Sequence, residues 1–199
     1  AQRNGRTKDG NDATDQGIIK MFGISKREDK IKALSELNIV PLSISYEWET
    51  CDYMKALELY QSRSEKYVKK QGEDLSSILS GITSFKGDVH LTFCPMITEQ
   101  DLMAYDSLPG IEYNREVAKL MDRRIHAGYR LTPNNFIAHD IRFGKHEFKG
   151  DRYTDEQKDR FLHHLKKLEK YDVDEPEVLM DIFLGIYSNP VDNCFERNH

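Results

Sequence analysis

Two short segments of the chain alternate apolar and polar residues, which is the pattern typical of a β-strand. They cover residues 38–49 and 88–95. The apolar residues that share a face are Val40, Leu42, Ile44 and Tyr46 in the first segment and Val89, Leu91 and Phe93 in the second. Pro95 ends the second segment, since proline cannot donate to a sheet ladder. The pattern predicts two strands, each buried on at least its apolar face.

Helical spacing of apolar residues dominates the rest of the chain. It predicts helices over 14–22, 25–37, 52–70 and 73–83, and an all-helical pattern after Pro95. Helix starts are indicated by Thr98 with Asp101, Thr154 with Gln157, Thr132-Pro133 and Asp174-Glu175-Pro176. The last strongly apolar helix is expected to end at Ser188-Asn189-Pro190.

The order of these elements predicts an α/β fold. Helical connections of more than a dozen residues between strands favour parallel pairing, so we expect a partial, mainly parallel sheet with flanking helices, followed by a helical C-terminal extension. Two strands are fewer than a stable sheet normally has, so the remaining strands are expected upstream of Ala1. We therefore divide the chain into residues 1–97, the C-terminal half of an α/β domain, and residues 98–199, a helical extension packed on it.

Composition narrows the class of protein. The 199 residues carry a net charge of −5, which argues against a dedicated nucleic-acid binder. No apolar run is long enough for a transmembrane helix, and no signal peptide is evident. The three cysteines are odd in number and far apart, and no metal-ligand spacing is present, which favours reduced thiols in the cytoplasm and no metal.

One cationic turn near the start is the first candidate site. Arg3, Gly5, Arg6 and Lys8 place three cations around a glycine. Arginine binds phosphate through paired hydrogen bonds, and a glycine lets backbone N–H groups approach the same anion. The turn therefore suits a phosphate site. The alternative is a solvated chain terminus without a ligand.

Other candidates have simpler explanations. His146 and Asp151 have the spacing His-x-x-x-x-Asp, but they lie in a polar loop that offers no rigid support for a general base. His163 and His164 lie on a helix whose buried stripe one of them is expected to flank. A further helix carries Arg115, Lys119 and Arg123 at i, i+4 and i+8. This basic face could contact phosphate or an anionic membrane, or it could simply be solvated.

The order of features resembles the second half of the catalytic domain of the glycerol-phosphate and lysophosphatidate acyltransferase family. The resemblance covers about residues 1–97, and residues 39–59 are its most specific part. Its elements are the turn AQRNGR, Gly17 in a short helix, the strand Ile-Val-Pro-x-x-Ile-x-Tyr-Glu at 39–47, the helix residues Tyr53, Lys55 and Glu58, and the strand Gly-x-Val-x-x-x-Phe at 87–93.

This resemblance implies an enzyme that moves a fatty acyl group from acyl-CoA or acyl-carrier protein to glycerol-phosphate or a related lipid acceptor. Arg3, Gly5, Arg6 and Lys8 would bind the acceptor phosphate. No cofactor beyond the thioester co-substrate is implied, and the enzyme would contact the inner face of the membrane peripherally. The family's His-x-x-x-x-Asp general base is expected upstream of this sequence. The isolated chain is therefore not expected to catalyse acyl transfer.

Two other classes of function remain open. Residues 96–199 could form a non-catalytic helical module that binds another protein. The chain could also belong to a soluble α/β enzyme that binds a nucleotide or a phosphosugar through the cationic turn.

Overall fold

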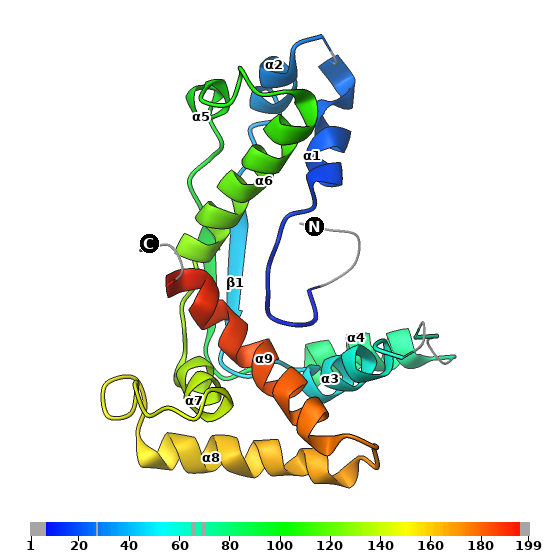
Figure 1. Cartoon of the computed structure of the whole chain (residues 1–199), viewed down its shortest axis with the longest axis vertical. Coiled ribbons are helices and arrows are strands. Elements are labelled where there is room, and N and C mark those ends of the chain that lie inside the picture. Colours follow the sequence, from blue (N-terminus) through cyan, green and yellow to red (C-terminus); the bar gives the residue numbers. More distant parts are fainter. Residues whose placement is uncertain (1–6, 27, 65–66, 69–70, 196–199) are drawn as a thin grey trace. The chain divides into compact units, whose positions relative to one another are not determined.

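The computed structural model describes residues 7–26, 28–64, 67–68 and 71–195 (Figure 1). It is a mixed structure, 58% helical, with one small sheet. The strands are β1 (Leu42–Tyr46) and β2 (Val89–Phe93). The helices before β2 are α1 (Gln16–Phe22), the 3-10 helix η1 (Gly23–Lys26), α2 (Lys30–Ser35), α3 (Asp52–Gln61) and α4 (Glu73–Thr83). Those after it are α5 (Glu99–Met103), α6 (Gly110–Ala127), α7 (Pro133–Arg142), α8 (Asp155–Leu165), the 3-10 helix η2 (Lys166–Lys170) and α9 (Pro176–Phe195).

The chain forms two compact units, and each unit draws on distant parts of the sequence. Unit 1 takes its described residues from 1–7, 12–44 and 91–129, and unit 2 takes its described residues from 8–11, 45–90 and 130–199. The expected boundary at residue 97 falls inside unit 1, between β2 and α5. The units therefore group the helices of the second half with elements of the first half.

The two strands pair with each other and run antiparallel. Near one end of the ladder the N–H of Cys94 donates to the carbonyl of Pro41 at 2.9 Å, and near the other the N–H of Glu47 donates to the carbonyl of Asp88 at 2.9 Å. Residue numbers rise along one strand as they fall along the other. The prediction of mainly parallel pairing is wrong for these strands, because a connection as long as α3 plus α4 can close either arrangement.

The apolar side of the sheet is exposed, which corrects a second expectation. We call this side the sheet face; its residues are Val40, Leu42, Ile44, Val89, Leu91 and Phe93, all more than 40% exposed. On β1, Ser43 is the buried residue. The cause lies at Gly128, after α6, where an added Cβ would lie 2.9 Å from Ser43 Cβ and from Cys94 Sγ. Close backbone approach there requires small side chains, so the polar side of β1 faces inward.

Unit 1 is built around helix α6. The apolar stripe of α6 packs with side chains from α1, α2 and α5, and the fully buried members of this core are Ile19, Leu34, Ile97, Leu102, Tyr113 and Val117. The N-cap box of α5 forms as predicted, since Thr98 and Asp101 exchange side-chain and backbone hydrogen bonds. This box satisfies N–H groups that the first helical turn leaves unpaired.

Unit 2 has a larger core, formed by α3, α7, α8 and α9. Its buried aromatic and aliphatic side chains include Phe136, Ile137, Phe161, Leu179, Phe183 and Tyr187. Helix α8 starts with the predicted Thr154–Gln157 box, and Pro133 and Pro176 are the first residues of α7 and α9. The N-terminal signals in the sequence therefore located the helix starts of this unit.

Helix ends were located less well. Helix α3 stops at Gln61 instead of continuing to residue 70. Helix α9 does not stop at Ser188-Asn189-Pro190 but continues through Pro190 to Phe195. Proline inside a helix removes one backbone hydrogen bond, and the carbonyl that loses its donor here is that of Ile186.

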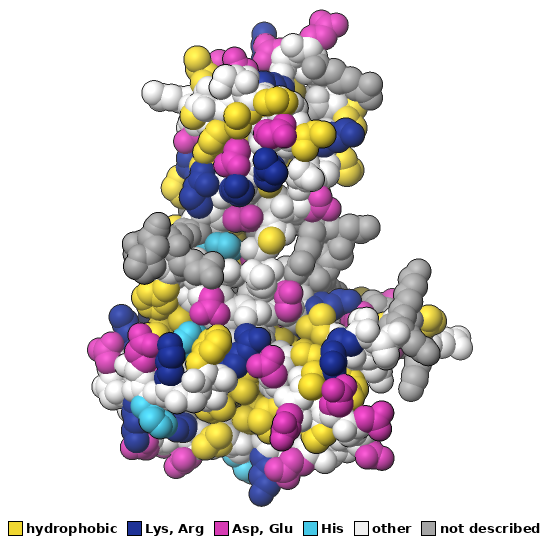
Figure 2. Space-filling model, in the orientation of Figure 1, with side chains coloured by type: hydrophobic (Ala, Val, Ile, Leu, Met, Phe, Trp, Pro, Cys, Tyr) yellow, Lys and Arg dark blue, Asp and Glu magenta, His cyan; other side chains and the backbone are white. Residues whose placement is uncertain are grey.

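Acidic and basic side chains are interspersed over the face of the molecule that Figure 2 shows, with no large area of a single sign. None of the helices in the described part of the chain is both long enough and apolar enough to cross a bilayer.

Candidate functional site

The predicted phosphate site lies mainly at Arg3, Gly5 and Arg6, which are outside the described residues. Its fourth member, Lys8, is described, and its ammonium group forms an ion pair with Glu58 of α3. Glu58 belongs to the helix pattern that carries the family resemblance. The pair therefore joins two sequence features that were identified separately, and it connects the last residue of the cationic turn to α3.

In unit 2 the segment Lys8–Asn11 lies on helix α9 at the proline. The side-chain amide of Asn189 donates to the carbonyl of Asp9 at 2.7 Å. Gly10 has φ +72°, and a Cβ at this position would lie 2.2 Å from the carbonyl oxygen of Ile186. This is the carbonyl that Pro190 leaves without a helical donor. The proline and the glycine therefore belong to one arrangement, in which only glycine fits.

Asn189 is itself held in place from helix α7. The guanidinium of Arg142 donates to Asn189 Oδ1 at 2.8 Å and to Ser188 Oγ at 3.1 Å, and it also pairs with Asp181 at 2.9 Å. Sequence reasoning took Ser188-Asn189-Pro190 for a helix end. The structure instead uses these residues to hold the segment that follows the cationic turn.

In unit 1 the continuation of the same segment is fixed to α6 and the residues after it. The hydroxyl of Tyr129 donates to the carboxylate of Asp12, and His126 Nε2 lies 2.8 Å from the carbonyl of Asp12. Thr14 donates to Asp122 Oδ1 twice, from its N–H at 2.8 Å and from its hydroxyl at 2.6 Å. Side chains of unit 1 thus determine the path of the backbone toward α1.

Unit 2 also contains a buried carboxylate that sequence reasoning missed. Asp52 is 2% exposed, and its Oδ2 lies 2.6 Å from His164 Nε2 and accepts the hydroxyl of Tyr187 at 2.7 Å. Its Oδ1 accepts the N–H of Tyr53 at 2.7 Å. Asp52 and His164 are 112 residues apart, so no local motif joins them. The available signal was a charged residue on the helix face that also carries the buried Ala56.

A carboxylate that orients an imidazole is one element of general-base chemistry. Here, however, aromatic rings surround the imidazole of His164, with centroids of Trp48, Tyr53 and Phe183 at 4.9, 4.8 and 5.9 Å. Burial, and next the charge of Asp52, raise the pKa of Tyr187 well above its usual value. We therefore interpret this group, the Asp52 cluster, as a structural link between α3, α8 and α9.

The loop with His146 and Asp151 is organised by a second buried aspartate. Asp140 of α7 accepts the N–H groups of Glu147 and Phe148 at 3.1 and 3.2 Å, and it accepts the hydroxyl of Tyr153 at 2.8 Å. Burial, followed by this hydrogen bond, raises the pKa of Tyr153. His146 and Asp151 are exposed in the loop between α7 and α8, as the sequence indicated.

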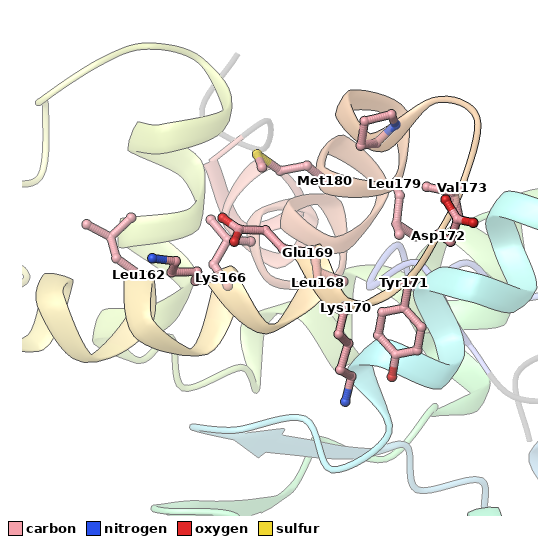
Figure 3. A pocket seen from close by; sticks show the side chains of 12 residues that line it. Leu162, Lys166, Leu168, Glu169, Lys170, Tyr171, Asp172, Val173, Leu179 and Met180 are labelled. Carbon is pink, nitrogen blue, oxygen red and sulfur yellow. The ribbon is translucent and has the colours of Figure 1, made fainter.

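An apolar pocket of about 710 Å³ lies where α8, η2 and α9 meet (Figure 3). Its apolar lining consists of Leu162, Leu165, Leu168, Val173, Pro176, Leu179 and Met180. Its charged lining consists of Lys166, Glu169, Lys170 and Asp172. The volume is within the range of ligand pockets, and such a lining suits a chain-like apolar group with a polar end.

In the part of the chain that the structure describes, no cluster of histidine, cysteine, aspartate or glutamate has the geometry of a metal site. No family model matches the chain, and comparisons with curated proteins and with solved structures likewise found no match.

Proposed function

We propose that this chain is part of an acyltransferase that moves a fatty acyl group from acyl-CoA or acyl-carrier protein to glycerol-phosphate or a related lipid acceptor. In this proposal Arg3, Gly5 and Arg6 bind the acceptor phosphate, and Lys8 contributes to the same anion site while it is held by Glu58. The general base belongs to a part of the parent protein outside this sequence. The enzyme contacts the membrane peripherally from the cytoplasmic side.

The observation that carries the proposal is the fixed path of the residues directly after the cationic turn. Phosphate recognition needs donors held in place, because each long side chain that must be ordered on binding costs affinity. Lys8 pairs with Glu58, Asp9 accepts from Asn189, and Gly10 lies against Ile186. This anchoring supports a turn built to present arginines, and it argues against the alternative of a solvated terminus.

The sheet supports the idea that the chain is part of a larger α/β domain. A two-stranded sheet is marginally stable by itself, and every residue of the sheet face is largely exposed. Contiguous exposed apolar surface marks a place that another structure covers. Further elements of a parent domain would cover it.

The apolar pocket of unit 2 supports a lipid-related function. Its floor consists of leucines from α8, η2 and α9, and the charged residues Lys166 and Glu169 line it as well (Figure 3). A saturated acyl chain gains free energy for each methylene that it buries, about 0.8 kcal/mol. Lys166 and Lys170, which also line the pocket, could contact the polar end of such a chain.

The first test is calorimetric titration of this chain with glycerol 3-phosphate and with glycerol. We expect binding of the phosphorylated ligand only. Arg3→Ala and Arg6→Ala should each weaken it by about tenfold or more, since a charge-assisted hydrogen bond contributes about 1.5–3 kcal/mol. Arg63→Ala is the matched control, because Arg63 is an exposed arginine paired with Glu175.

Lys8→Ala separates the two roles of the lysine. If Lys8 only anchors the segment, Glu58→Ala should weaken glycerol 3-phosphate binding as much as Lys8→Ala does. If Lys8 contacts the phosphate, Lys8→Ala should weaken it more. Equal binding by the wild type and by the double variant of Arg3 and Arg6 would refute the phosphate-site assignment.

A further inference from the structure

The basic face of helix α6 has a feature that its sequence spacing does not reveal. Arg115 and Lys119 are exposed on this helix, and a pocket of about 300 Å³ lies between them and the start of α1. Thr14, Gln16 and Asp122 also line the pocket. The residues all belong to unit 1. A solvated basic face would not require such a concave arrangement.

The charges of several basic side chains act on Glu116, which lies next to Arg115 on α6. The pKa of Glu116 is lowered first by its hydrogen bond with Lys119 and further by the charges of Lys119, Arg115 and Arg123. Lys119 pairs with Glu116 at 2.8 Å, whereas no carboxylate among the described residues lies within ion-pair distance of the Arg115 guanidinium. Within the described residues the Arg115 guanidinium therefore has no ion pair, although Asp122 also lines the pocket.

The acidic residue of the pocket has a different role. Asp122 Oδ1 accepts both hydrogen bonds that Thr14 donates, at 2.8 and 2.6 Å. This contact holds the start of α1 against α6 and keeps the wall of the pocket in place. Oδ1 of this carboxylate is thus occupied by its own protein partner, and Arg115 and Lys119 are the cationic residues in the lining.

We propose that Arg115 and Lys119 form a binding site for a phosphate group, independent of the cationic turn at Arg3–Arg6. Arg115 would bind the phosphate through paired N–H donors, and Lys119 would contribute a point charge. The pocket is larger than a bare phosphate ion, so it suits a phosphate that carries an organic group. That group could be part of a soluble phosphate ester or of an anionic lipid headgroup, and both present the same chemistry.

The test is titration of the isotope-labelled chain with inorganic phosphate, glycerol 3-phosphate and vesicles that contain phosphatidate. We expect chemical-shift changes at Arg115, Lys119 and Gln16 with glycerol 3-phosphate, with the vesicles, or with both. Arg115→Gln should weaken the interaction by about tenfold. Arg160→Gln, at an exposed arginine of α8, should change it less than twofold. A response to glycerol 3-phosphate would identify a soluble phosphate ester as the source of the phosphate. A response to the vesicles alone would identify a lipid headgroup.

Thermal unfolding of each variant verifies that the fold is retained, which is expected because both side chains are exposed. Unchanged affinity in both Arg115→Gln and Lys119→Gln would overturn the site. That result can be told apart from failure of the proposed function: Arg3→Ala and Arg6→Ala would still weaken binding of glycerol 3-phosphate. If Arg115→Gln and Lys119→Gln weakened binding and Arg3→Ala and Arg6→Ala did not, this site would stand and the phosphate-site assignment of the cationic turn would be refuted.

Discussion

Phenylalanine side chains are buried in the helical core of unit 2 but exposed on the sheet face. Phe183 of α9 is fully buried, and its ring stacks on Tyr53 and lies near Tyr187. Phe93 of β2 is 72% exposed. The core of α3, α7, α8 and α9 buries its apolar side chains, whereas the sheet face and helix α4 of unit 2, with Leu75 65% and Ile82 72% exposed, do not. The helical core therefore excludes water from its rings, and the sheet face leaves its apolar residues open to solvent.

The largest expected difference in the free energy of unfolding is between two substitutions that each remove a phenylalanine ring, one from the helical core and one from the sheet face. Phe183→Ala should lower the free energy of unfolding by about 3–5 kcal/mol, because it leaves a cavity in a packed core. Phe93→Ala should lower it by less than about 1 kcal/mol, because little of that ring is removed from water. Urea denaturation measures both. Equal losses would show that the sheet face is covered in solution.

The second effect concerns the Asp52 cluster. Tyr187→Phe removes the hydroxyl that donates to Asp52, which should cost about 1.5–3 kcal/mol at neutral pH. The pKa of Tyr187 is raised in the folded state, whereas an unfolded tyrosine titrates near 10. Its stabilising contribution is therefore complete below about pH 10 and falls as the pH rises further.

Urea denaturation of the wild type and Tyr187→Phe across this alkaline range provides the measurement. The difference between them should shrink above about pH 10. Tyr46→Phe is the control, since the Tyr46 hydroxyl makes no hydrogen bond to any described residue. A constant difference across the range would contradict the role assigned to this hydroxyl.

The sequence predicted those parts of the fold that depend on local interactions and failed on those that depend on distant contacts. The boxes at Thr98 and Thr154 and the positions of both strands are local signals, and the structure has them. Strand direction and the buried side of the sheet depend on distant contacts, such as that of Gly128 with Ser43, so both expectations were wrong. Pro190 indicated a helix end, but α9 continues through it. The contact of Gly10 with Ile186 that accompanies this proline joins distant residues and cannot be read from the sequence.

The candidate site shows the same division. The pairing of Lys8 with Glu58 and the Asp52–His164 contact join residues far apart in the chain. Residue types and spacing indicated a cationic turn and a histidine beside a buried stripe, but no pattern along the chain could pair them with partners. The carboxylates of Glu58 and Asp52 reach their partners only because α3 packs with α8 and α9.

A third prediction tests a local signal inside the helical core. Thr154→Ala removes the N-cap of α8 and should cost about 1 kcal/mol. Thr83→Ala, on exposed α4, removes a hydroxyl that bonds only to its own helix at Leu79, and it should change the stability by less than about 0.5 kcal/mol. Thermal unfolding compares the two. If Thr83→Ala cost more, the cap would not determine where α8 begins.

The smallest effect on stability is expected at the sheet face. Leu91→Lys should change the free energy of unfolding by less than about 0.5 kcal/mol, because Leu91 is already 48% exposed. The same change should reduce self-association of the chain, since exposed apolar patches and open strand edges promote it. Sedimentation velocity over a range of concentrations tests this. Unchanged association would show that the sheet face does not mediate it.

The most direct test of the central claim is acyl transfer by the protein at its full natural length, with a labelled acyl thioester and glycerol 3-phosphate. We expect transfer that depends on the phosphate of the acceptor. We also expect that replacing Arg3 and Arg6 together by alanine raises the KM for the acceptor at least tenfold and leaves the KM for the thioester unchanged. No transfer, or the same acceptor KM in the variant, would refute the proposed function.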